Sequence, residues 1–245
     1  MKKIIIFLLC IAILGCSQND SKSSESITNS DGAGGSLAIF VLKGNYLYSV
    51  DDSKLNVFSL VDPENPTFVN FVNVGFNIET LFSNGEYLFI GSRNGMFIYT
   101  VTNPENPTKL SSVQHFTACD PVVANATHSF VTLHSNTNCG NMINVLQVYN
   151  TTNPNQPQLV HSRNLVYPKG LALYGNYLFV CDDSIKIFNI ANPTEPVLVK
   201  SIDKNCFDLI IKDNNLFAIG EKGLYRYLLD DINIQNIAFK SEIIF

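Results

Sequence analysis

Short segments in which apolar residues recur at every second position run through this chain, separated by turns rich in Gly, Asn, Asp and Pro. The pattern is clearest in residues 54–60, 96–101 and 184–190, where many of the apolar residues are β-branched or aromatic. A period of two in such residues predicts β-strands and not helices. No segment between residues 37 and 245 has a helical pattern, so we predict an all-β protein.

A five-residue turn, Asx-Pro-x-x-Pro, ends the same strand in four successive units of the chain. Proline lacks the N–H that a strand ladder needs, which explains why the strand stops there. The first prolines of the four turns are 41, 50 and 39 residues apart. A spacing of about 40 residues predicts one supersecondary unit repeated in tandem. The four turns begin at Asp62, Asn103, Asn153 and Asn192.

Each unit contains four predicted strands. An apolar strand is followed by an aromatic-rich strand such as residues 46–50, then by the alternating strand, and by a fourth strand after the proline turn. Four antiparallel strands in about 40 residues are typical of a β-propeller blade, whereas solenoid repeats are usually about 20 to 30 residues long. We therefore predict a five-bladed β-propeller of four-stranded antiparallel blades, with blades at about 37–77, 78–119, 120–168, 169–205 and 206–245.

The last blade differs from the others because its turn, residues 231–235, has lost both prolines. The predicted propeller begins on an innermost strand and ends on an outermost one. No strand is left to be exchanged between the first and the last blade. We therefore expect these two blades to meet through side-chain packing alone.

The stretch Asn176–Pro196, NYLFVCDDSIKIFNIANPTEP, resembles the LVIVD repeat of bacterial surface and secreted proteins, many of which are lipoproteins. It has the aromatic-rich strand, the short acidic turn, the aliphatic strand and the closing Pro-x-x-Pro of that repeat. The resemblance extends over roughly residues 37–245, with an insertion in blade 3 and divergence in blade 5. It implies a β-propeller fold and a role in adhesion or protein interaction, and it brings no established catalytic residues. The chain has no Trp, which excludes the Trp-Asp blade signature of WD40 repeats and the Trp-bearing turn of sialidase-type propellers.

The first fifteen residues resemble a lipoprotein signal peptide. Lys2 and Lys3 precede an apolar run, Ile4–Leu14, that is too short to span a bilayer, which takes about 20 residues. The run leads to Cys16 in a sequence that resembles a bacterial lipobox, so we predict that Cys16 is lipidated and attaches the protein to a membrane. An ordinary cleaved signal peptide with a chance cysteine is the alternative. Residues 16–36, rich in Ser, Asn, Asp and Gly, are predicted to be a flexible tether.

The charge of the chain argues against a nucleic-acid partner. The formal net charge is −5, and it becomes −7 once Lys2 and Lys3 leave with the signal peptide. Nucleic-acid binding requires clustered Lys and Arg, which an acidic domain with few charges lacks. The sequence contains no phosphate loop, nucleotide fingerprint or nucleophile elbow, so no cofactor is predicted. The predicted location is the bacterial cell envelope outside the cytoplasm, at the outer membrane or the cell surface.

Four cysteines lie in the predicted propeller. In a propeller, the loops into the first strand of each blade and the loops between its second and third strands share one face, which we call the top face. All four cysteines are expected near it, and an even number outside the cytoplasm predicts disulfides. The preferred pairing is Cys119 with Cys139 and Cys181 with Cys206, and the two other pairings stay open.

A zinc site is the alternative role for this region. His128 and His134 lie near Cys139 in the sequence, and nitrogen and sulfur ligands suit zinc. No C-x-x-C or H-E-x-x-H spacing is present, so no metal is predicted.

The top-face loops are the predicted place for ligand binding, because long loops on a rigid scaffold are often functional. The insertion in blade 3 lengthens one such loop, which includes Asn136, Asn138 and Asn141. Aspartate is also favoured in tight turns for turn chemistry alone. The hairpin turns at this face contribute the remaining candidates, Asp51, Asp52, Arg93, Asp182 and Asp183.

The predicted function is that of a non-catalytic extracytoplasmic lipoprotein that binds a protein or a glycan through these loops. The alternative is a glycan-active enzyme that uses top-face acids such as Asp51 and Asp182. Glycosidases require two carboxyl groups about 5 to 10 Å apart on either side of the sugar bond. A structural envelope protein without a soluble ligand is a third reading.

Overall fold

The computed structural model describes residues 35–114, 121–135 and 143–245, which form five four-stranded antiparallel sheets. Blades 1 and 2 consist of β1 (Phe40–Lys43), β2 (Tyr46–Val50), β3 (Lys54–Ser59) and β4 (Thr67–Asn73), then β5 (Ile78–Asn84), β6 (Tyr87–Ser92), β7 (Gly95–Thr100) and β8 (Thr108–Gln114). Blade 3 consists of β9 (Val122–Ala124), β10 (His128–Leu133), β11 (Val145–Asn150) and β12 (Gln158–Asn164). Blades 4 and 5 consist of β13 (Leu171–Tyr174), β14 (Tyr177–Cys181), β15 (Ile185–Asn189) and β16 (Val197–Ile202), then β17 (Asp208–Lys212), β18 (Asn215–Gly220), β19 (Gly223–Leu228) and β20 (Ala238–Ile244).

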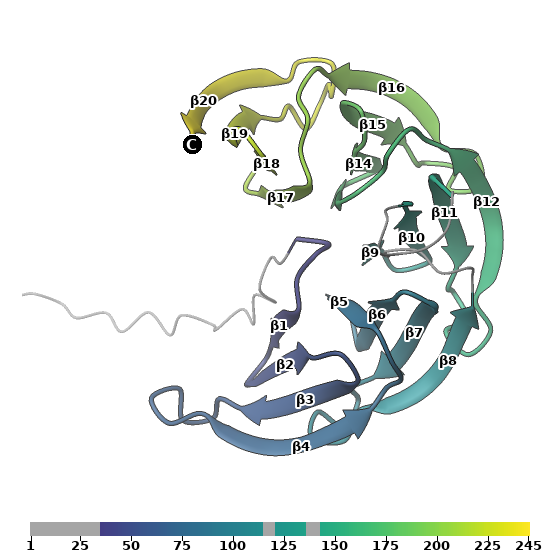
Figure 1. The fold of residues 1–245 in the computed structure, drawn as a ribbon, viewed down its shortest axis with the longest axis vertical. Coiled ribbons are helices and arrows are strands. Elements are labelled where there is room, and N and C mark those ends of the chain that lie inside the picture. The colour runs from purple at the N-terminus through teal and green to yellow at the C-terminus, as the bar shows by residue number, and fades with distance from the viewer. Residues whose placement is uncertain (1–34, 115–120, 136–142) are drawn as a thin grey trace, which may run out of the picture.

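The five sheets are arranged around a common axis, with the first strand of each blade nearest the axis and the fourth strand outside (Figure 1). This arrangement confirms the predicted five-bladed β-propeller. Within the described residues, no helix is long and apolar enough to cross a membrane.

The hairpins between the first and second strands depend on residues that accept a positive φ. Gly44, Gly85 and Gly175 have φ values of 56°, 54° and 53°, and Asn214 has 58° in blade 5. A Cβ atom added at any of these three glycines would meet nothing within 4 Å. The glycines are therefore required by backbone conformation and not by lack of space.

The proline turns are held by the side chain that begins each of them. The side-chain oxygen of Asn192 accepts a hydrogen bond of 3.2 Å from the N–H of Thr194, and Asp62 does the same for Glu64 at 3.1 Å. In blade 5, Asn233 accepts from the N–H of Gln235 at 3.0 Å. The Asx turn thus persists in blade 5 without the two prolines.

Each fourth strand contains a β-bulge at the same place, which leaves one residue without a partner on the third strand. In blades 1 to 4 this residue is aliphatic and partly buried between its blade and the next one. The five bulge residues are Val69, Leu110, Val160, Val199 and, in blade 5, Lys240.

Four hydrophobic clusters hold the blades together. One cluster lies between each pair of successive blades, from blades 1 and 2 to blades 4 and 5. No cluster of described residues spans blades 5 and 1. A closed ring of five blades would need five such interfaces, so this propeller is open between its first and last blades (Figure 1).

Side-chain exposure at repeat-equivalent positions supports the open ring. Phe40 is 57% exposed on β1, whereas the residues at the same register in the other four blades are at most 1% exposed: Leu81, Val122, Leu171 and Leu209. On the other side of the opening, Phe217 is partly exposed. Its equivalents in blades 1 to 4 are at most 2% exposed: Tyr48, Phe89, Phe130 and Phe179. The expectation that blades 1 and 5 meet through side-chain packing is therefore wrong.

We name the two exposed sheet faces after their blades. The blade-1 flank comprises the outward positions of blade 1: Phe40, Leu42, Leu47, Ser49, Phe58 and Leu60. The blade-5 flank comprises the positions of blade 5 that in other blades face the next blade: Ile210, Phe217, Ile219, Leu224, Arg226, Leu228 and Lys240.

The segment before β1 links the two ends of the ring instead. The buried Ser36 hydroxyl donates a hydrogen bond of 3.2 Å to Asp208 at the start of β17 and accepts one of 2.7 Å from the N–H of Leu171. The carbonyl of Ala38 accepts from the N–H of Leu81 at 2.7 Å. Residues 36–38 therefore connect blade 2 to blades 4 and 5 across the middle of the molecule.

The Asp208 carboxylate that bonds this segment is destabilised by burial. Burial raises the pKa of its carboxyl group above the ordinary value of 3.8, and hydrogen bonds from Ser36 and from the N–H groups of Leu37 and Leu209 offset this only in part. The ionised carboxylate is thus destabilised by desolvation while it holds the N-terminal segment in place.

The open ring predicts unequal effects of equivalent truncations. Phe179→Ala removes a fully buried ring between blades 4 and 5 and should destabilise the protein by about 3 to 5 kcal/mol. Phe217→Ala removes the equivalent ring from an uncovered flank and should cost no more than about 1 to 2 kcal/mol. Urea denaturation of both variants measures the difference. Equal losses would mean that the ring closes in solution.

The raised pKa of Asp208 predicts a pH dependence. Asp208→Asn keeps an acceptor for Ser36 and removes the buried charge. Since the folded protein binds the Asp208 proton more tightly than the unfolded chain does, wild-type stability should fall relative to the variant as pH rises from about 4 through the raised pKa, and then level off. Urea unfolding of both proteins between roughly pH 3 and pH 7 tests this. A free-energy difference that stays constant with pH would contradict it.

Candidate functional site

A cleft of about 440 Å³ lies on the top face between blades 4 and 5. We call it the blade 4–5 cleft. Charged and aromatic side chains dominate its lining, which consists of Tyr167, Lys169, Asp182, Asp183, Asp203, Lys204, Asn205, Cys206, Phe207, Glu221, Lys222 and Tyr225. Two of the predicted candidates, Asp182 and Asp183, are therefore brought together at one site.

Asp182 is fully enclosed by its own hydrogen bonds. Its side chain has no exposed surface. It accepts from the N–H of Val166 at 3.0 Å and of Tyr167 at 2.5 Å, and from the ammonium group of Lys186 at 2.5 Å. These bonds fix the loop that presents Val166 and Tyr167 to solvent. Asp182 thus shapes the cleft and does not offer a free carboxylate to it.

Asp183 is half exposed and shares the same lysine. The Lys186 ammonium lies 2.9 Å from its carboxylate. The hydrogen bond from Lys186 lowers the pKa of Asp183, and burial of the carboxylate opposes this only in part. Burial pulls the pKa of Lys186 down, but hydrogen bonds and charge from both aspartates outweigh it, so that pKa is raised. Asp183 is therefore held as a carboxylate in an ion pair with Lys186 and is not poised to donate a proton.

Two lysines of the cleft lie over tyrosine rings. The Lys169 ammonium is 4.9 Å from the ring centroid of Tyr167, and that of Lys204 is 4.3 Å from the ring centroid of Tyr225. The ring of His134 packs edge-on against Tyr167, with centroids 5.4 Å apart. Cation–π contacts of this kind hold each ammonium group above its ring. The cleft thus presents positioned cations beside apolar surface.

A disulfide joins the two blades beside the cleft. Cys181 at the end of β14 is bonded to Cys206, which precedes β17 and lines the cleft. This confirms the preferred pairing for these two cysteines. Cys119 and Cys139 lie outside the described residues, and so does Cys16.

The other predicted candidates are placed elsewhere. Asp51 serves its own hairpin: it accepts from the N–H groups of Ser53 and Lys54 at 3.0 and 2.9 Å, and the Ser53 bond in particular lowers the pKa of Asp51. Asp52 is exposed in the same turn. Arg93 forms an ion pair of 2.7 Å with Glu79. None of these candidates lines the blade 4–5 cleft. Asn136, Asn138 and Asn141 fall outside the described residues.

The histidines weighed for a zinc site have other neighbours. Nδ1 of His128 lies 2.8 Å from the hydroxyl of Thr127, and burial lowers the pKa of His128. His134 packs against Tyr167. In the part of the chain that the structure describes, no group of three or more His, Cys, Asp or Glu residues is placed to hold a metal ion.

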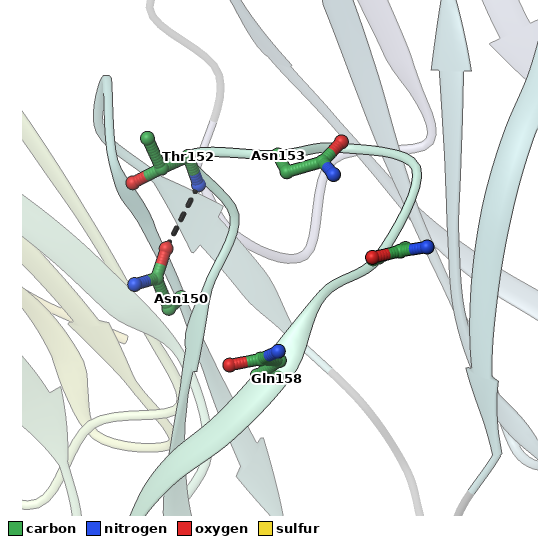
Figure 2. Close-up of a pocket in the computed structure, with 5 residues that line it drawn as sticks. Asn150, Thr152, Asn153 and Gln158 are labelled. Atoms are coloured by element: carbon green, nitrogen blue, oxygen red, sulfur yellow. Dashed lines mark hydrogen bonds between the residues drawn. The ribbon is translucent and has the colours of Figure 1, made fainter.

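A second depression, of about 230 Å³, lies on the opposite face at the proline turn of blade 3. Figure 2 shows the amide side chains around it and the hydrogen bond of 3.0 Å that the N–H of Thr152 donates to Asn150. Asn153 in turn accepts from the N–H of Asn155. Because these amides stabilise the turn itself, this depression is a weaker candidate than the blade 4–5 cleft.

Sequence reasoning missed the basic and aromatic half of the cleft. Tyr167 and Lys169 lie in a short loop between repeats, where no motif marks them. Lys186 is the residue whose position could have suggested a partner for Asp182. It lies on the strand that follows the Asp182-Asp183 turn, four residues after Asp182, and its ammonium group pairs with the Asp182 carboxylate. The alternation of residues 184–190 places Lys186 at a polar position but does not indicate that it bonds both acids.

Comparisons with known proteins agree with this fold. A model of the LVIVD repeat family matches residues 167–204, which make up blade 4, and confirms the resemblance drawn from the sequence. No curated protein sequence matches the chain significantly.

Solved structures that resemble the chain share its fold at low identity. A Lactobacillus plantarum protein has a TM-score of 0.66 at 9% identity, covering 82% of this chain and 68% of its own. A functionally unknown protein from Desulfotomaculum acetoxidans has 0.65 at 11%, covering 88% and 69%. A periplasmic gluconolactonase from Pseudomonas aeruginosa has 0.63 at 13%, covering 82% and 67%. Identities this low show the fold alone.

The disulfide should matter for the last blade. It closes a separation of 25 residues, and the double variant Cys181→Ser/Cys206→Ser is expected to lose about 3 kcal/mol. Blade 5 has a hydrophobic cluster on one side only, so the loss should fall mainly there. Amide hydrogen exchange followed by mass spectrometry, with and without reductant, measures it. Protection lost equally in blades 1 and 5 would contradict this expectation.

Proposed function

We propose that this chain, a β-propeller whose fourth blade carries an LVIVD repeat, is a non-catalytic lipoprotein of the bacterial cell envelope. It binds a protein or glycan ligand through the blade 4–5 cleft on its top face. The lipid is attached at Cys16, and the residues between it and the buried Gly35 and Ser36 form the tether.

The state of the acids in the cleft carries this proposal. Asp182 is saturated by two backbone N–H groups and Lys186, and Asp183 shares that lysine. General acid catalysis at neutral pH needs a carboxyl group with a raised pKa, and the pKa of Asp183 is lowered instead. The cleft also contains the acids Asp203 and Glu221. Beside them it offers a ligand three lysines, of which Lys169 and Lys204 are held over tyrosine rings, and this arrangement suits recognition.

The position of the first described residue fits the tether. Gly35 lies so close to Asp208 that an added Cβ would stand 2.2 Å from its carboxylate oxygen. Asp208 begins β17, so the tether joins the domain on the face that bears the cleft. An anchored protein would then bind ligands near its attached face.

The competing proposal is a glycan-active enzyme. Its support is limited to the fold that the chain shares with a periplasmic gluconolactonase at 13% identity. Asp51, the other acid considered for catalysis, is in blade 1 and holds its own hairpin.

Charge removal in the cleft tests the proposal. Lys169→Ala/Lys222→Ala takes two cations from the cleft rim, and Lys54→Ala/Lys109→Ala takes two from outside it as a matched control. With full-length protein in detergent, binding to glycan and envelope-protein arrays is expected to weaken about tenfold in the cleft variant and to persist in the control.

Product analysis of the same incubations tests the enzyme. Release of a sugar product that disappears in Asp183→Ala would overturn the non-catalytic reading. Equal binding by the cleft variant and the control would remove the cleft from consideration as the ligand site.

A further inference from the structure

The blade-5 flank differs in kind from the faces that pack between blades. On the third strand, one position is aliphatic and fully buried in each of the first four blades and is Arg226 in blade 5. The four aliphatic residues are Val57, Ile98, Val148 and Ile187. The bulge residue of the fourth strand follows the same rule, because it is aliphatic in blades 1 to 4 and is Lys240 in blade 5. Two adjacent aliphatic positions have thus become basic in the last blade alone.

These two cations have no acidic partner among the described residues. Nε of Arg226 donates to the side-chain oxygen of Asn215 at 2.9 Å, and Arg226 and Lys240 are both exposed. The chain as a whole is acidic, with a formal net charge of −5. An unpaired basic pair at one place on an acidic protein attracts acidic groups.

The rest of the flank has stayed apolar. Ile210 and Leu228 are each 38% exposed, and Phe217, Ile219 and Leu224 are partly exposed. The outer face of a capping repeat, which contacts only water, is polar and lacks such exposed apolar side chains. The blade-5 flank therefore combines two cations with a continuous apolar surface, which is the composition of a binding face.

Charge decides what can cover this flank. In a closed propeller the blade-5 flank would pack against the blade-1 flank, which here could come from the same chain or from a second copy. No residue of the blade-1 flank is acidic, and Lys54 lies beside it over the ring of Phe71 at 4.7 Å. Packing the two flanks together would bury Arg226 and Lys240 without a counter-ion, which is costly.

We propose that the blade-5 flank binds an acidic, amphipathic segment of a partner protein. Acidic side chains of the segment pair with Arg226 and Lys240, and its apolar side chains cover Phe217, Ile219 and Leu224. This surface is separate from the blade 4–5 cleft, so either site can fail a test while the other passes.

Fluorescence anisotropy with two synthetic peptides tests the proposal. One labelled peptide alternates Leu and Glu, and the other alternates Leu and Lys. Full-length protein should bind the Leu–Glu peptide and not the Leu–Lys peptide. Arg226→Glu/Lys240→Glu should weaken Leu–Glu binding about tenfold or more. Arg226→Gln/Lys240→Gln should give a smaller loss, and it guards against misfolding of the reversal variant.

The matched control is Lys109→Glu/Arg163→Glu. It makes the same change of charge on the outer strands of blades 2 and 3, where the two cations lie over Phe97 and Phe188. This control and the cleft variant Lys169→Ala/Lys222→Ala should both retain peptide binding.

Three results would overturn the proposal. The first is equal binding of the two peptides, and the second is an equal loss in the flank variant and the control. The third is a concentration-dependent dimer in light scattering that Arg226→Glu/Lys240→Glu abolishes, since that would assign the flank to a second copy.

Discussion

Packing of one sheet face onto the next is the interaction on which this molecule depends. Each blade is a four-stranded sheet whose two faces are both apolar, so a blade is stable only where a neighbour covers it. Five blades with four such interfaces form a curved row with two ends. The Ser36–Asp208 contact and the Cys181–Cys206 disulfide strengthen the row near its last blade, where one neighbour is missing. The cleft also lies there, where two blades and their joining loop meet.

The repeat made much of this fold predictable. Proline spacing gave the blade length, the period of two gave the strands, and positive-φ residues such as Gly175 marked the hairpins. The Cys181–Cys206 pairing followed because both residues belong to loops of one face in neighbouring blades. Local rules of this kind succeed because each blade obeys them independently of the others.

Contacts between the ends of the row could not be read in the same way. The sequence of a tandem repeat does not indicate whether its first and last copies are in contact. Ser36 also lies in a segment whose composition predicts only a tether. In the cleft, Asp182 resembled a free acid because its partners, two N–H groups of the preceding loop and Lys186, become visible only in three dimensions. Arg226 and Lys240 did leave a signal, since each interrupts an aliphatic position of the repeat.

A row with ends loses its structure differently from a closed wheel. In a wheel every blade has two neighbours, so no blade is the obvious place for unfolding to begin. Here the free-energy cost of opening should rise from the terminal blades toward blade 3, as in a linear repeat array that frays from its ends. The disulfide binds blade 5 covalently to blade 4, whereas blade 1 relies on noncovalent contacts. Reducing conditions would therefore be expected to move the weakest point of the molecule from one end to the other.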